Sequence, residues 1–120
     1  MRSGRRSEAG AATAELALGI PLLVALTAGL VWMLALGAAQ VRVIDASREA
    51  ARAVARGDDV ASAESVALRI APDDARVRIE VGENEVVVVT SARVSGPGGL
   101  LASLPAVTVS SEAVALVESS

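Results

Sequence analysis

Glu15 is the residue whose type and position most clearly indicate a specific chemistry. It lies in the stretch GAATAELALGIP (residues 10–21), directly before the run 16–39, which carries no charged side chain. A carboxylate at the edge of an apolar run loses hydration. Either a neighbouring cation or the positive N-terminal end of a helix offsets that loss. We therefore expect an ion pair or a helix-dipole contact at Glu15, and the residues alone favour the dipole contact.

The residue types that most enzymes use are missing. The chain has no histidine and no cysteine, which removes the usual general base, the thiolate nucleophile and the commonest metal ligands. The acidic pairs Asp58–Asp59 and Asp73–Asp74 lack the further ligands of a calcium loop, so we expect a helix cap and a turn. The loop 96–99 lacks the lysine and helix of a phosphate loop. With a formal net charge of −3, the sequence predicts no enzyme, metal, cofactor, small-molecule substrate or nucleic acid.

The apolar run predicts the element that holds Glu15. About 20 apolar residues cross a bilayer core, so we expect one transmembrane helix and a membrane as partner. The chain then divides into a leader (1–10), a transmembrane helix (11–39), an amphipathic helix extension (40–57) and a small extracytoplasmic domain (58–120).

Orientation and processing leave alternatives. Arginines flank the apolar run on both sides, so the positive-inside rule does not decide the orientation. We expect a cytoplasmic N-terminus, because a short N-terminus inside is the usual outcome for a first span. A secretory signal cut before Gln40 competes with the anchor, although the run exceeds the length of a secretory core.

The helical pattern continues beyond the membrane segment. One face of 40–56 carries Val43, Ser47, Ala50 and Val54, and we expect it to pack on the domain. The other face predicts the ion pairs Arg42–Asp45, Asp45–Arg48 and Glu49–Arg52.

The complete first helix is predicted from Ala12 to Arg56, where Gly57 ends it. Bends are expected at Pro21, Gly29 and Gly37. Ala25 and Gly29 have the small-xxx-small spacing that lets another helix approach closely. Trp32 lies well inside the span, which favours packing over interfacial anchoring.

The rest of the sequence predicts a short second helix and a small sheet. The helix runs to about Ile70 and ends at Pro72. Alternating residues 76–81, a turn at 82–84 and a Val-rich strand 86–94 predict a hairpin whose second strand is central. A loop follows, whose Leu100, Leu101 and Leu104 are expected to contact the sheet. The last strand, from Val107 to Leu116, should bulge near Ser110–Ser111 because its apolar parity changes there. The predicted class is α+β.

A resemblance follows from these residues. Gly10, Ala11 and a glutamate five residues after the glycine, before an apolar helix, resemble a type IV prepilin processing site. AELALGIP (14–21) is similar to the signature of the TadE family, with a proline six residues after the glutamate. The downstream AAQVRVIDASREAARAVARGDD is similar to actinobacterial TadE-like minor pilins. The family often has an aromatic residue where Leu16 stands, and many relatives have a cysteine in the following helix.

The resemblance implies a minor pilin or pseudopilin of a tight-adherence (Tad, Flp, type IV-like) pilus system that serves cell adhesion. A prepilin peptidase would cut after Gly10, and the helix would then assemble into or onto the pilus through Glu15, Leu16 and Pro21. Its partners would be the membrane, the peptidase, other Tad/Flp pilins and minor pilins, and the assembly machinery.

Cleavage after Gly10 would change the chemistry at Glu15. It would free the ammonium of Ala11, four residues away, and with that group the ion pair becomes the favoured arrangement. Removing three arginines and one glutamate would lower the net charge from −3 to −5. The alternative is a secreted or membrane-anchored β-rich binding domain without a pilus role.

Overall fold

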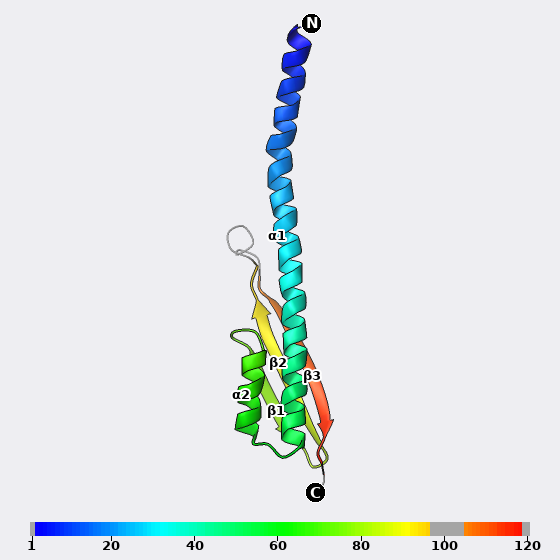
Figure 1. Cartoon of the computed structure of the whole chain (residues 1–120), viewed down its shortest axis with the longest axis vertical. Coiled ribbons are helices and arrows are strands. Elements are labelled where there is room, and N and C mark those ends of the chain that lie inside the picture. Colours follow the sequence, from blue (N-terminus) through cyan, green and yellow to red (C-terminus); the bar gives the residue numbers. More distant parts are fainter. Residues whose placement is uncertain (1, 97–104, 119–120) are drawn as a thin grey trace.

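The protein is one long helix that carries a two-layer domain on its C-terminal half (Figure 1). A computed structural model describes residues 2–96 and 105–118 of the chain. The elements in chain order are α1 (Arg2–Ala55), α2 (Val60–Ile70), β1 (Arg76–Val81), β2 (Glu85–Val94) and β3 (Val107–Leu116). The predicted α+β class is confirmed. The expected contacts of Leu100, Leu101 and Leu104 lie outside the described residues.

Helix α1 is longer than predicted. It begins at Arg2 rather than Ala12 and runs for 54 residues through Pro21, Gly29 and Gly37 without a break. The leader contains alanine, arginine and glutamate, which are good helix formers, so nothing in it stops a helix that is already extended. At 1.5 Å per residue α1 is about 80 Å long, and the whole protein measures 91 × 20 × 17 Å.

Gly57 ends α1 as predicted. Its φ of 105° is left-handed, a conformation that glycine adopts without steric penalty. The Gly57 amide donates to Val54 O at 3.0 Å and the Asp58 amide donates to Ala53 O at 2.9 Å. These two bonds form a Schellman motif, which satisfies carbonyls that the helix end would leave unpaired.

The acidic pairs are structural, although one contact differs from the prediction. Asp59 occupies the N-cap position of α2, but its side chain makes no capping hydrogen bond. Asp58 instead accepts from Arg56 at 3.0 Å. Asp74 has the left-handed φ of 61° in the turn where the Ala75 amide donates to Pro72 O at 3.2 Å, a conformation that Asp tolerates better than most residues.

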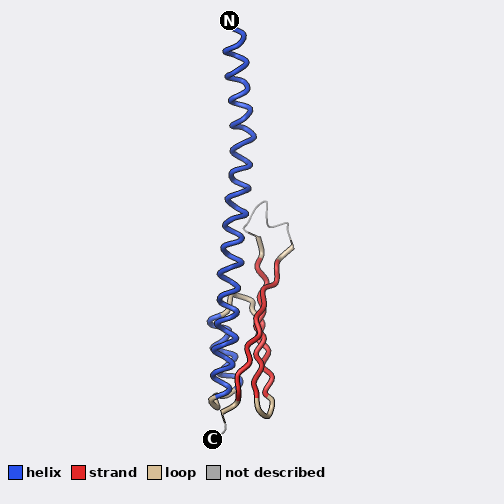
Figure 2. Tube along the Cα trace, turned by 90° about the vertical axis from the view of Figure 1, so that its right-hand side faces the viewer, coloured by secondary structure: helices blue, strands red, loops and turns tan. Residues whose placement is uncertain are grey.

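The sheet is antiparallel with the order β1-β2-β3, so the prediction that the Val-rich strand is central is confirmed. The predicted turn joins β1 to β2 through the two-residue loop 83–84, closed by the Gly82 amide donating to Glu85 O at 2.8 Å. Helices α1 and α2 cover one face of the sheet and leave the other face uncovered (Figure 2).

The predicted bulge at Ser110–Ser111 is wrong. β3 pairs with β2 residue by residue from Val107 opposite Val94 to Leu116 opposite Glu85. The move of the apolar residues of β3 from odd-numbered to even-numbered positions has a different cause. Positions that face the helices carry the small residues Ser111, Ala113 and Ala115, while the larger Val114 and Leu116 point outward and are 54% and 76% exposed. Small side chains let α1 lie close to the sheet.

The core lies between the sheet and the helices and consists mostly of alanine and valine. The predicted inner face of α1 is confirmed, since Val43, Ser47 and Ala50 are each 0% exposed. A second cluster joins Leu36, Ala39 and Val43 of α1 to Ala92, Val94 and Val109 of the sheet. The domain therefore reaches along α1 as far as Leu36.

Candidate functional site

The N-terminal half of α1 is an apolar helix with little covering. Except for Trp32, its large apolar side chains are at least half exposed, from Leu16 at 63% to Leu34 at 74%. The domain begins at Leu36, so the stretch 16–35 is about 30 Å long at 1.5 Å per residue, which matches a bilayer core. By length and composition, this helix is one candidate membrane span among the described residues. An apolar helix of this kind fits membrane anchoring.

The proposed cleavage bond lies inside this helix. Gly10 and Ala11 are exposed and helical, and a Cβ added at Gly10 would meet nothing within 4 Å. The Thr13 hydroxyl donates to Ala9 O at 2.9 Å, across the bond between residues 10 and 11. A peptidase that takes an extended chain must first unwind this segment. Glycine lowers the helix preference by about 1 kcal/mol relative to alanine, so Gly10 makes that unwinding easier.

Glu15 has no cation within two helical turns on either side along α1. It is exposed, and the next charged residue toward the C-terminus is Arg42, about 40 Å farther along α1. In the other direction, Glu8 lies about 10 Å away along the axis, and Arg6, the nearest cation, about 14 Å away. If cleavage removed the leader, the Ala11 ammonium would be the cation nearest to Glu15 along the helix, one turn away.

Pro21 and Gly29 are two special positions of the apolar half. Pro21 is inside α1 and has no amide hydrogen, so the Ala17 carbonyl lacks its usual helical donor. A Cβ at Gly29 would also meet nothing within 4 Å, so this surface, with Ala25 one turn away, has room for another helix. Leu16, Ala25 and Pro21 are exposed.

Trp32 is partly buried near the domain end of the apolar half. Its indole nitrogen is buried and has no hydrogen-bond partner among the described residues. Partial burial is in keeping with the packing expected from the sequence. Because Trp32 is the single tryptophan and the chain has no tyrosine, its fluorescence reports on this position alone.

Polar contacts join α1 to the domain. The Ser47 hydroxyl donates to Thr90 Oγ1 at 2.7 Å, and both residues are fully buried. Gln40 donates to Ser110 O at 3.1 Å and Arg42 to Ile70 O at 3.1 Å. Of the three predicted ion pairs, Glu49–Arg52 forms at 2.8 Å. Sequence reasoning missed the link to Thr90, although a serine within an apolar helix face was a signal of a buried polar contact.

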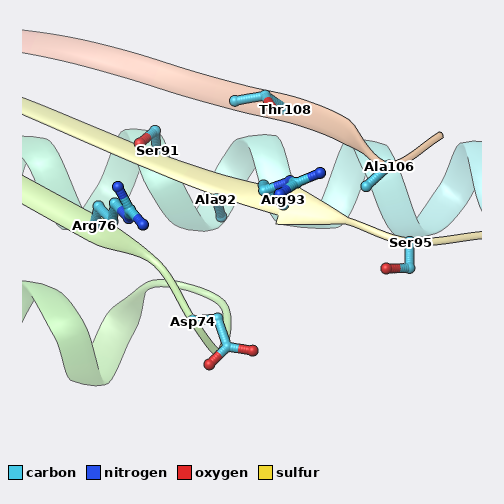
Figure 3. Close-up of a pocket in the computed structure, with 8 residues that line it drawn as sticks. All are labelled: Asp74, Arg76, Ser91, Ala92, Arg93, Ser95, Ala106 and Thr108. Carbon is cyan, nitrogen blue, oxygen red and sulfur yellow. The ribbon is translucent and has the colours of Figure 1, made fainter.

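A polar hollow of about 590 Å³ lies at the end of the sheet nearest the apolar half of α1. Figure 3 shows the side chains that line it, which come from all three strands and the adjacent loops. It combines two guanidinium groups with hydroxyls and one carboxylate, from Arg76, Arg93, Ser91, Ser95, Thr108 and Asp74. Within the described ranges, no group of three or more acidic side chains is placed to hold a metal ion. The hollow was not predicted from the sequence.

The two-layer domain and the apolar half of α1 together define a class, a small α+β protein on a helix that fits membrane anchoring. A comparison with protein families sharpens this class. The family model described as TadE-like protein matches residues 10–52, so the resemblance to TadE-like proteins is confirmed over that segment. The match spans Gly10, Glu15 and Pro21 and suggests a pilin-like role associated with the Tad pilus. No curated protein and no solved structure matches the chain.

Proposed function

We propose that this protein is a minor pilin, or pseudopilin, of a Tad/Flp pilus. A prepilin peptidase cuts it after Gly10, and α1 carries it into or onto the pilus. The domain 58–120 lies outside the membrane, the leader 1–10 lies in the cytoplasm, and the protein is not an enzyme. The observation that carries the proposal is the carboxylate of Glu15, which has no nearby cation and lies one helical turn from Ala11, at the edge of an exposed apolar helix within the TadE-like segment.

The charge arrangement supplies the mechanism. Leaving either a carboxylate or an ammonium alone in low-dielectric surroundings costs several kcal/mol. During assembly, Glu15 of one subunit receives the Ala11 ammonium of its own or a neighbouring chain. Where the pair joins two chains, a subunit in the wrong axial position leaves both charges unpaired. The small surface at Ala25 and Gly29 lets the helices of neighbouring pilins approach closely.

Mass spectrometry of the mature N-terminus tests the processing step. A chain purified from cells with the Tad system should begin at Ala11. A chain that begins at Gln40 would indicate a secreted protein, and one that begins at Met1 or Arg2 would indicate a simple membrane anchor. Either of those two results would overturn the proposal.

Replacement of the carboxylate tests assembly. Glu15→Ala should leave membrane insertion and cleavage largely intact and abolish co-purification with other pilus components. Glu8→Ala is the matched control, because it removes an exposed carboxylate of the same helix from the leader that cleavage discards. Unchanged co-purification of Glu15→Ala would count against the assembly role.

A further inference from the structure

The edge strands of the sheet are β1 and β3. In each of them, alternate residues point their amide and carbonyl groups toward β2, and the residues between them point these groups away from the sheet. The hydrogen bonds from Gly82 N to Glu85 O and from Val117 N to Asn84 O fix the alternation of the antiparallel ladders. On β1, the residues whose amides and carbonyls point outward are therefore Val77, Ile79 and Val81. On β3 they are the even-numbered residues, including Glu112 and Val114, and among these Ser110 O already accepts one hydrogen bond from Gln40 at 3.1 Å. Unpaired edges of this kind are templates for a further strand.

One row across the sheet has opposite charges at its two edges, although its cation, Arg78, also lies 3.8 Å from Glu80 Oε1 of its own strand. Arg78 is opposite Val89, and Val89 is opposite Glu112, so one row across the sheet begins with a cation and ends with an anion. Both charged residues are exposed. Alternation along the strands directs both side chains to the face that the helices leave uncovered.

If two copies are anchored in the same bilayer by α1, the directions in which their strands can pair are restricted. β1 and β3 both run antiparallel to β2, so they run parallel to each other, and all three strands follow the axis of α1 (Figures 1 and 2). Two copies with the same orientation in one bilayer have their helices pointing the same way at the same depth. Antiparallel pairing of two β3 strands would point the helices in opposite directions. A β3 edge can therefore pair in parallel with the β1 edge of a second copy, without an axial shift.

The register without an axial shift lets the backbone hydrogen bonds form and also brings opposite charges together. It sets Glu112 opposite Arg78 of the second copy. In a parallel ladder, a residue whose amide and carbonyl point toward the adjacent strand does not bond to the residue directly opposite. It bonds to the two residues on either side of that one. Glu112 faces outward, and Val77 and Ile79, which flank Arg78, also face outward. Membrane depth, strand direction, backbone alternation and charge all select one register.

We propose that the β3 edge of one copy pairs in parallel with the β1 edge of a second copy, with Glu112 beside Arg78, and extends the sheet between anchored subunits. The contact is head-to-tail and leaves one edge open on each side, so it generates a row rather than a closed dimer. The inference rests on the membrane anchoring within the proposed function and is independent of cleavage after Gly10.

Engineered disulfides test the register, because the chain has no cysteine of its own. Glu80 and Val114 share a row through Val87 and would lie opposite each other between copies, about 4.8 Å apart. Differently tagged full-length Val114→Cys and Glu80→Cys chains are co-expressed, and their membranes are oxidised. The mixed disulfide should be the main product. The control mixture of Leu116→Cys with Glu80→Cys, shifted by two residues at another exposed position of β3, keeps Arg78 and Glu112 and should give far less. Equal yields in both mixtures would overturn the proposal.

Charge reversal adds a second readout in the same membranes. Arg78→Glu should lower the yield of the Val114–Glu80 disulfide by about twofold to fivefold, as expected for an exposed ion pair. Adding Glu112→Arg to the same chains should restore it, and an unchanged yield after Arg78→Glu would contradict the pairing.

Two further measurements separate this inference from the proposed function. Chains that resist alkaline carbonate extraction and begin at Ala11, but give no matched disulfide, would refute the edge pairing alone. Matched disulfides in uncut chains would support the pairing while contradicting the processing. Chains that carbonate releases from the membrane would overturn both.

Discussion

Two segments of α1 differ in what lies against them. Residues 36–55 are covered by the sheet and α2, whereas residues 16–35 are largely exposed, and the two segments differ in side-chain size. The half 16–35 exposes leucines and valines, whereas the half 36–55 buries alanines against the sheet and α2. A fluid lipid environment fits side chains of any size, while a packed protein interior at crystalline density does not. Side-chain size along one continuous helix therefore marks where the domain begins, at Leu36.

The same comparison separates positions that matter to the fold from positions that matter to partners. A substitution at an exposed position of 16–35 changes little packing among the described residues, so we expect any strong effect there to come through the membrane, a peptidase or another subunit. A substitution in the covered half changes the packing of the domain itself. Matched substitutions in the two halves can test this separation.

The largest effect is expected at Gly10. Gly10→Leu should reduce cleavage after residue 10 below detection, since a peptidase site that accepts glycine in an extended chain has no space for a branched side chain. It should leave the fold unchanged, because a Cβ at Gly10 meets nothing within 4 Å. The mature N-terminus is measured by mass spectrometry. Gly19→Leu, at another open helical glycine, is the control and should be cut normally. Cleavage of Gly10→Leu at the same bond would refute the processing step.

The next effect is expected at Ala50. This residue is 0% exposed in the core, and Ala50→Leu adds three carbons to a fully packed site. Overpacking of this kind costs about 1–3 kcal/mol. Amide hydrogen exchange of β2, measured on the full chain in detergent micelles, should accelerate accordingly. Ala17→Leu makes the same change at an exposed position and should alter exchange by less than about 0.5 kcal/mol. Equal effects would show that the two halves do not differ in packing.

Much of the fold could be predicted from the sequence, because the strongest patterns were long. The uncharged run, the inner face through Val43 and Ser47, and the glycine at the end of α1 each depend on local physics. The start of α1 was missed because a charged leader signals processing but carries no helix stop. The predicted bulge in β3 was wrong because it assumed that apolar residues always point to the core. Where a helix lies close to the sheet, small side chains point toward the helix and larger apolar ones point outward.

The candidate site divides in the same way. Gly10, Glu15 and Pro21 lie close together in the sequence, and the TadE-like match covers all three. The hollow near Arg76 and Arg93 and the row from Arg78 to Glu112 depend on strand register. Register joins residues more than 30 positions apart, and composition does not reveal it.

The smallest of these effects is expected at the polar contact that holds the covered half of α1 to the sheet. Ser47→Ala would leave the fully buried Thr90 hydroxyl without the partner that now lies 2.7 Å away. An unpaired buried hydroxyl costs about 1–3 kcal/mol, and the better helix preference of alanine offsets about 0.5 kcal/mol of that. The same exchange measurement on β2 should therefore show a loss near the lower end of this range. Ser62→Ala, on the exposed surface of α2, makes the same chemical change and should show only the gain in helix preference, about 0.5 kcal/mol. Adding Thr90→Val to Ser47→Ala should recover most of the loss, because the unpaired buried hydroxyl is then removed and only the second contact of Ser47, to Ser111 O at 3.0 Å, stays lost. If the double variant were no more stable than Ser47→Ala, the contact between the helix and the sheet would owe its stability to packing alone.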